Sequence, residues 1–251
     1  MMRFACLLLA GLATMFVDGA LAQSALDIPL IKLQSQPGGG QTLSLSLQTL
    51  ALMTALTLLP SLLLVTTSFT RIIITLSILR QALGTQQTPP NQVLVGLALF
   101  MTLFIMAPTF KTINETAFTP YTNGEIQIEE AASRATGTMK GFMLRHTRES
   151  DLLLIADLQG DKSYSSPEAV PLQVLVPAFM MSELRTAFTI GFLLFLPFLV
   201  IDIVVASILM SLGMMMLSPT LVSLPFKLLL FVIVDGWAAT ITALVESFVR
   251  G

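Results

Sequence analysis

The chain has 251 residues, of which 54% are hydrophobic and only 11% are charged, and its formal net charge is −2. Soluble domains contain about 25% charged residues, so a soluble monomer of this composition would expose large apolar patches. The composition therefore excludes a soluble enzyme and favours a membrane protein or a subunit of a large assembly. The absence of excess positive charge also argues against nucleic acid as a partner.

The first 22 residues have the three parts of a secretory signal peptide. Arg3 supplies the positive charge, residues 4–17 form an apolar core, and a small-x-small motif predicts cleavage between Ala22 and Gln23. This core is shorter than the about 20 residues that a spanning helix needs, although an uncleaved anchor is the alternative. Cleavage removes Cys6, the only cysteine, so the mature chain would have neither a disulfide nor a thiolate nucleophile.

Two hydrophobic blocks follow, separated by a polar segment. Residues 23–42 are polar and punctuated by Gly and Pro, which predicts a flexible leader. The first block, residues 43–110, contains only two charges, Arg71 and Arg80. Proline disrupts helices, and Pro89 and Pro90 lie between two apolar stretches of this block. The block is therefore predicted to be a helical hairpin. The expected parts are a helix from about 43 towards 83 interrupted at Pro60, a turn at 84–91, and a helix from 92 to 107 or 110.

The polar segment, residues 111–185, holds seven basic and ten acidic residues. Apolar or small side chains recur at helical spacing over 124–161, which predicts helix there. The positive-inside rule places this segment outside the membrane. The second block, residues 186–251, predicts another hairpin, with a helix over 186–216, a turn at 218–219 and a helix over 226–249. The expected fold is thus all-α, with four long hydrophobic helices and a polar, mostly helical middle.

Residues that could carry catalysis are almost absent. The single histidine, His146, lies in a polar run and is interpreted as a solvated side chain. One histidine without a cysteine or a second histidine cannot form a zinc site, and no serine or cysteine pairs with it in a triad pattern. The sequence therefore predicts no enzyme, no metal and no cofactor.

The unusual residues are charges inside the apolar blocks. Asp202 and Asp235 both lie in strongly apolar stretches, where an ionised carboxylate costs about 2.5–3.5 kcal/mol on the insertion scale. Lys227 and the pair Arg71 and Arg80 are candidate counter-ions. Two interpretations stay open: a structural ion pair or helix-cap bond, and a proton or ion relay. The relay gives the alternative function, a proton- or ion-coupled secondary transporter that uses Asp202 or Asp235.

Three consecutive methionines, Met214, Met215 and Met216, precede the predicted turn at Pro219. Successive helical residues point about 100° apart, so the three side chains cannot share one face. Methionine is flexible and adapts to irregular surroundings. In a ring of subunits such a turn would form a soft constriction, whereas in a monomer it would only fill gaps in the core.

Long stretches of both blocks resemble one family. RIIITLSILRQALGTQQTPPNQVLVGLALFMTLFIMAP, and the segment from PAFMMSELRTAF through GMMMLSP to FVIVDGW, are similar to the FliP/SctR family of type III export-gate proteins. The flagellar branch is the more similar of its two branches. Thr189 departs mildly from the family pattern, which affects only local packing.

The resemblance implies a homopentamer that assembles with FliQ- and FliR-type subunits into a helical gate, near FlhA- and FlhB-type components. It also implies a location in the bacterial inner membrane at the flagellar basal body, with a large periplasmic part. Met214, Met215 and Met216 would form a gasket across the channel. Glu183, Arg185 and Asp202 would make polar contacts that hold the assembly. The implied function is a pore through which unfolded flagellar rod, hook and filament proteins are exported.

Overall fold

A computed structural model describes residues 32–35, 41–44, 47–85, 87–160, 164, 166, 169–214 and 216–249. The chain divides into two compact units, Met1–Pro60 and Ser61–Gly251. The predicted signal cleavage between Ala22 and Gln23 lies outside the described residues, and so does Met215.

The first unit contains a short antiparallel strand pair. β1 (Lys32–Ser35) and β2 (Gln41–Ser44) pair so that Leu33 lies opposite Leu43. The sequence predicts a flexible leader in this region, because four residues are too few for an alternating pattern to stand out. The helix α2 (Leu47–Val65) begins in the same unit.

The first predicted helix is two helices, and the predicted interruption at Pro60 is wrong. Helix α2 continues through position 60 to Val65, and α3 (Phe69–Leu83) follows after a three-residue break. In the break, Thr66 Oγ1 donates to Leu62 O at 3.1 Å and Thr67 Oγ1 donates to Leu64 O at 3.0 Å. Such bonds offer the terminal carbonyls partners other than the next helical N–H groups.

The predicted hairpin between α3 and the next helix is present. Gly84 ends α3 with φ +75°, a conformation that glycine adopts without steric cost. Helix α4 (Asn91–Ile113) then continues through the π-helix η1 (Asn114–Phe118) into α5 (Thr119–Thr122). The helical path is therefore longer than predicted, because Pro108 removes only one backbone donor and does not end it.

The polar segment is helical as predicted, but its expected boundary with the second block is wrong. α6 (Ile128–His146) and α7 (Glu149–Gln159) lie within the predicted range. Helix α8 (Leu172–Ser211) then runs for 40 residues without a break. It starts well before the expected position 186 because the charged residues near that position are paired with neighbours and do not interrupt the helix.

The last predicted helix is also two helices. α9 (Pro219–Ile233) and α10 (Gly236–Val249) meet at a bend of 64°. Asp235, expected in mid-helix, lies at this bend with φ +50°. A Cβ atom at Gly236 would overlap the ring of Phe231, so the close packing at the bend requires a glycine there.

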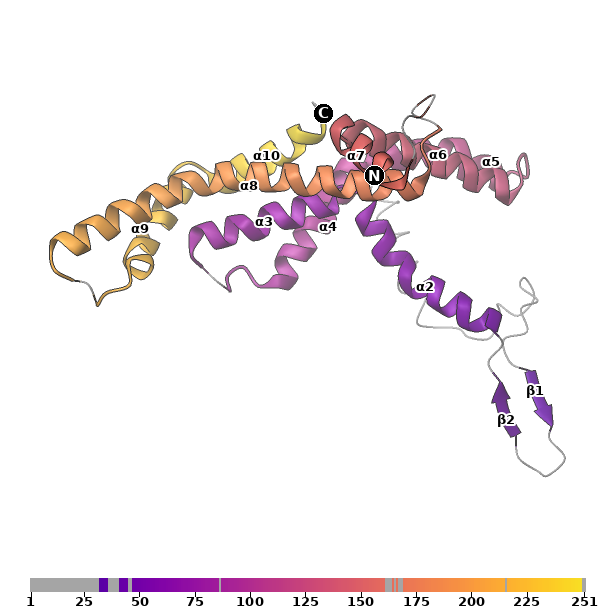
Figure 1. Cartoon of the computed structure of the whole chain (residues 1–251), viewed down its shortest axis with the longest axis horizontal. Helices are drawn as coiled ribbons and strands as arrows, with labels where there is room; N and C mark the ends of the chain where they lie inside the picture. Colours follow the sequence, from indigo (N-terminus) through magenta and orange to yellow (C-terminus); the bar gives the residue numbers. More distant parts are fainter. Residues whose placement is uncertain are drawn as a thin grey trace. The chain divides into compact units, whose positions relative to one another are not determined.

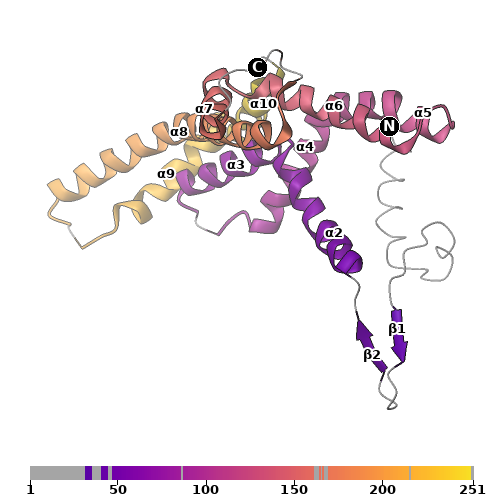
Figure 2. The ribbon, with the colours of Figure 1, turned by 45° about the vertical axis from the view of Figure 1, so that its right-hand side comes forward.

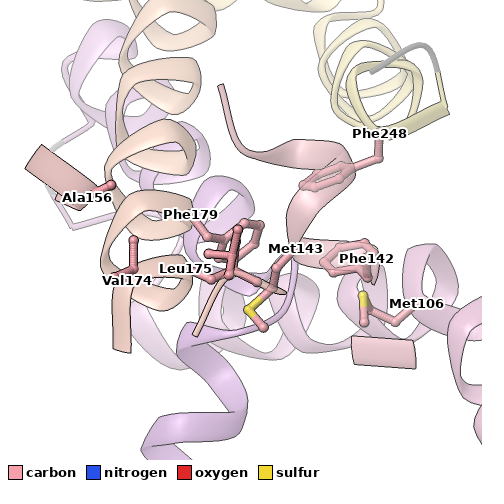
Figure 3. Packing of buried hydrophobic residues seen from close by; sticks show 9 residues of the cluster. Met106, Phe142, Met143, Ala156, Val174, Leu175, Phe179 and Phe248 are labelled. Carbon is pink, nitrogen blue, oxygen red and sulfur yellow. The ribbon is translucent and has the colours of Figure 1, made fainter. Parts of the chain in front are cut away.

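Helix α3 lies against α8, and α9 turns back beside α8 (Figures 1 and 2). The largest buried cluster among the described residues joins α4, α6, α7, α8 and α10. In its centre Phe142 and Met143 of α6 gather with Phe179 of α8, and Phe248 reaches in from α10 (Figure 3). Two helical stretches, Asn91–Thr122 and Leu172–Ser211, are long and apolar enough to span a membrane, and the bent α9–α10 pair would be a third. The part of the chain that the structure describes thus contains two or three candidate spans, where the sequence predicted four long hydrophobic helices.

Candidate functional site

A buried ion pair joins three helices. Arg71 of α3 donates to Glu183 of α8 through Nε at 2.8 Å and through Nη2 at 2.5 Å, and the two side chains are 3% and 0% exposed. Arg71 Nη1 also donates to the carbonyl oxygen and the hydroxyl of Ser247 in α10, both at 2.9 Å. The ring of Phe248 lies 3.7 Å from the guanidinium carbon. Because buried charges are tolerated only when paired and hydrogen-bonded, this pair fixes α3, α8 and α10 together.

A second buried carboxylate fastens α7 to α8. Asp151 is 1% exposed; it accepts a hydrogen bond from Ser182 Oγ at 2.7 Å and pairs with Arg185 Nη2 at 3.1 Å. The backbone N–H of Arg148 donates to the same serine hydroxyl at 3.0 Å. Arg185 is half exposed, so its charge remains accessible at the surface of the chain.

A third ion pair joins α8 and α9 near the end of α3. Lys227 Nζ lies 2.6 Å from Asp202 Oδ2 and donates to Ala82 O at 3.2 Å. Ser223 Oγ donates to the other carboxylate oxygen of Asp202 at 2.5 Å. Of the counter-ions that the sequence suggested for Asp202, Lys227 is the one in contact with it. Arg71 binds Glu183, and Arg80 donates to Pro89 O and Asn91 Oδ1, both at 3.3 Å.

Asp235 is not brought together with these pairs. It is exposed at the α9–α10 bend, where its own N–H donates to Val232 O at 3.2 Å and its carbonyl accepts from Ala239 N–H at 3.0 Å. Within the described ranges it belongs to none of the ion pairs. Its visible role is to begin the bend, since aspartate tolerates a positive φ better than most residues.

The turn between α8 and α9, residues 212–218, presents apolar side chains to the outside. Met216 is 100% exposed and Met214 is 45% exposed. Gly213, with φ +71°, lets the chain reverse direction after α8. The turn lies at the tip of the α8–α9 hairpin, at the left of Figure 1.

Large apolar surfaces are also left uncovered on α8 and on the α4–α5 stretch. Only 11% of the most apolar stretch of α8 is buried inside the protein. The corresponding share for the α4–α5 stretch is 28%. The exposed large side chains on the α8 surface include Phe188, Phe192, Val200, Ile203, Val204 and Ile208. Contiguous apolar surface of this extent marks contact with a membrane or with other protein.

Sequence reasoning missed the partners of two buried acids. Asp151 was one of many charges in a polar segment, and Glu183 was singled out only by the family resemblance. The sequence feature that could have indicated the partner of Glu183 is Arg71, because it is a cation in an otherwise apolar block. Among the described residues, no group of three or more His, Cys, Asp and Glu side chains could hold a metal ion.

Long apolar helices, ion pairs buried between them and uncovered apolar surface define a helical membrane protein. A sequence profile of the FliP family matches residues 52–244. The chain belongs to the FliP family.

Individual relatives agree with this assignment. The flagellar biosynthetic protein FliP of Cereibacter sphaeroides is 63% identical over 210 residues, which make up 84% of this chain and 70% of that protein. The FliP proteins of Pectobacterium carotovorum subsp. carotovorum and Bacillus subtilis (strain 168) are 54% and 51% identical over 88% and 83% of this chain, and 86% and 94% of their own lengths. The resemblance noted in the sequence is thereby confirmed. The chain is a flagellar biosynthesis protein with membrane helices, and not an enzyme.

Proposed function

We propose that the chain is a pore-forming subunit of the flagellar protein export gate, through which unfolded rod, hook and filament proteins cross the bacterial inner membrane. The observation that carries the proposal is the α8–α9 turn, where Met214 and Met216 project from the end of a hairpin instead of entering a core. An exposed methionine costs solubility in a monomer, whereas in a ring of copies it can close a central opening.

The proposal includes assembly into a homopentamer with FliQ- and FliR-type subunits, next to FlhA- and FlhB-type components. Two observations support the assembly: the buried charges already have partners within the chain, whereas the apolar surface of α8 does not. The ion pairs Arg71–Glu183 and Asp202–Lys227 are completed within one chain. Within the described residues, most of the apolar surface of α8 is not covered by other parts of the chain. Further copies or partner subunits would cover it, and a large periplasmic part would then include α6 and α7.

In this gate the methionines act as a passive seal. Their unbranched side chains change rotamer easily and follow the shape of whatever they touch. They would close on one another at rest and yield around a passing chain. Met215, by position in the sequence, would contribute to the same seal.

The seal is tested by replacing Met214, Met215 and Met216 together with alanine. We expect the complex to assemble and the leak of small ions through it to rise, measured as conductance in planar bilayers. Met53→Ala is the matched control, because Met53 is also exposed, at 54%, but lies in α2. If the triple variant conducts no more than the control, the methionines are not the seal.

A transporter that uses Asp202 is separated from a gate subunit by Asp202→Asn. A transporter variant would fold and lose ion-coupled flux, whereas a gate subunit would lose assembly or change little. The two outcomes are read by native mass measurement of the extracted complex and by flux into proteoliposomes.

The mature chain should begin at Gln23, which N-terminal sequencing of the membrane protein can check.

A further inference from the structure

A groove lies between the C-terminal parts of three helices, α4, α6 and α10. Its volume is about 340 Å³, and ligand sites in proteins usually measure about 300–1,000 Å³. The groove can therefore take a small molecule or one slender chain of a larger molecule. Most of its wall is hydrocarbon, supplied by Phe104, Ile105, Pro108, Val245 and Val249.

The base of the groove belongs to the buried cluster of the fold. Phe142 and Phe248 are both buried, and their rings stack with centroids 6.4 Å apart (Figure 3). His146 is half-buried in contact with both rings, so the interpretation of a solvated side chain is wrong. Its Nε2 lies 3.2 Å from Phe248 O, which joins the end of α10 to α6. The chain itself thus forms the groove, without a ligand.

Thr109 of α4 gives this wall a polar group that the described part of the chain does not use. Thr109 is only 7% exposed and lines the groove. Thr102 and Thr112 of the same helix donate to the carbonyl oxygens four residues earlier, at 2.7 Å and 3.1 Å. Within the described ranges the hydroxyl of Thr109 makes neither this bond nor another hydrogen bond. Because buried polar side chains nearly always have a hydrogen-bond partner, this hydroxyl is available to a ligand in the groove.

Arg145 of α6 adds a positive charge to the same groove. Its side chain is exposed, and a Cβ atom at Gly141 would lie 3.8 Å from its Nη1, so the guanidinium lies back along the helix. Among the described residues Arg145 takes part in no ion pair or hydrogen bond. The other described arginines are all engaged in such contacts: Arg71, Arg80, Arg134, Arg148 and Arg185.

The groove lies where the apolar part of α4 ends. Residues 92–110 carry no charge, and Lys111 is the first charged residue after them. On α4, Phe100 and Phe104 are 75% and 66% exposed, and Phe104 also forms part of the groove wall. In a candidate membrane span such a surface is suited to hydrocarbon. A lipid chain can therefore enter the groove from the hydrocarbon layer, while a long cationic side chain reaches the level of the headgroups.

We propose that this groove binds one anionic phospholipid. An acyl chain lies along the hydrocarbon wall, and the guanidinium of Arg145 binds the phosphate, for which its planar set of donors is suited. The hydroxyl of Thr109 donates to an ester or phosphate oxygen of the same lipid. Among the described residues no carboxylate lines the groove to match the ammonium of a zwitterionic headgroup. The inference does not rest on the proposed pore, because no residue of the α8–α9 turn takes part.

The headgroup contact is tested by adding phosphatidylglycerol or phosphatidylcholine to the full-length chain, purified with its membrane complex in a mild detergent. Native mass spectrometry measures the lipid bound to each chain. We expect phosphatidylglycerol to bind the wild type about tenfold more tightly than Arg145→Gln, because hydrogen bonds to a charged group are lost. Phosphatidylcholine should bind both proteins equally weakly.

Arg134→Gln is the matched control, because Arg134 is an exposed arginine of α6 that pairs with Glu130 and does not line the groove. Its affinity for phosphatidylglycerol should equal that of the wild type. Equal binding by the wild type, Arg145→Gln and Arg134→Gln would overturn the proposal.

The role of Thr109 is tested by Thr109→Val, which keeps the shape of the side chain and removes the hydroxyl. The affinity for phosphatidylglycerol should fall about threefold, as expected for one neutral hydrogen bond. Thr112→Val is the control, since the hydroxyl of Thr112 already donates to Pro108 O, and its affinity should not change. An equal loss in both variants, or no loss in Thr109→Val, would overturn this contact.

Two other occupants are separated from a lipid by further measurements. Inorganic phosphate in excess should leave phosphatidylglycerol bound, and displacement of the lipid would make the groove a site for the free anion. In the assembled complex, a photoreactive amino acid in place of Phe104 should form cross-links to lipid. Cross-links to another protein subunit instead would make the groove a protein contact, and either of these contrary results would overturn the proposal.

Discussion

The two halves of α8 differ, although they belong to one unbroken helix. In the first half, residues 172–191, Phe179, Glu183 and Ala187 are completely buried, and Asp151 and Arg71 supply partners for its polar side chains. In the second half, residues 192–211, Phe198, Val205 and Leu209 are the described residues that are buried, and large apolar side chains face outward.

The two halves of α8 therefore depend on different partners for their stability. The first half is stabilised within one chain, and its polar contacts are already complete. The second half carries apolar surface that water would not tolerate over such an area, and this surface needs lipid or further protein. Substitutions of the buried residues in the first half should therefore affect the fold, and substitutions of the outward-facing apolar residues in the second half should affect assembly.

The largest effect is expected from Arg71→Met, which leaves Glu183 buried without its partner. Breaking a buried ion pair from one side costs about 3–5 kcal/mol. The free energy of unfolding, measured in detergent by denaturant titration, should fall by that amount. The double variant Arg71→Met with Glu183→Met is the control, because it removes both charges. If the double variant is no more stable than the single one, the cost comes from lost packing and not from the unpaired charge.

A smaller loss is expected from Gly191→Ala, where α8 crosses α3. A Cβ atom there would lie 2.5 Å from Ile78 Cδ1 and 2.9 Å from its Cγ2. Overpacking of this kind costs about 1–3 kcal/mol. Adding Ile78→Ala should restore part of the stability, since it removes both clashing carbons.

Gly96→Ala gives the matched comparison for that crossing. Gly96 lies inside α4, and nothing is within 4 Å of its ideal Cβ position. Because alanine is the better helix former by about 1 kcal/mol, thermal unfolding of this variant should occur at a slightly higher temperature than that of the wild type. Equal destabilisation of both glycine variants would contradict the close approach of α3 and α8 at Gly191.

The smallest effect on folding is expected from Ile208→Ser in the second half of α8, where Ile208 is 54% exposed. Surface substitutions of this kind change stability by about 0.5 kcal/mol or less. The native mass of the extracted complex should nevertheless decrease, because the apolar contact surface is weakened. An unchanged complex together with a large loss of stability would reverse the comparison between the two halves.

The sequence predicted the helical class, the α3–α4 hairpin and the polar helical segment, because periodicity and proline-rich turns are local signals. It did not predict the break after Val65 or the bend at Asp235. The break depends on hydrogen bonds from threonine hydroxyls to backbone carbonyls, and the bend depends on the Phe231 ring packed against Gly236. The spacing of residue types in the sequence does not predict either contact. It found Lys227 as a possible partner of Asp202, but not Arg71 as the partner of Glu183, since those two residues lie 112 positions apart.

The length of α8 sets a limit on how any bilayer can surround it. Forty residues at 1.5 Å each give a rod of about 60 Å, whereas the hydrocarbon layer is about 30 Å thick. Even a strong tilt of about 40° would immerse only two thirds of the rod. At least a third of this helix must therefore stand clear of the lipid tails as a stalk, and the early segment with Ser182, Glu183 and Arg185 is suited to that position.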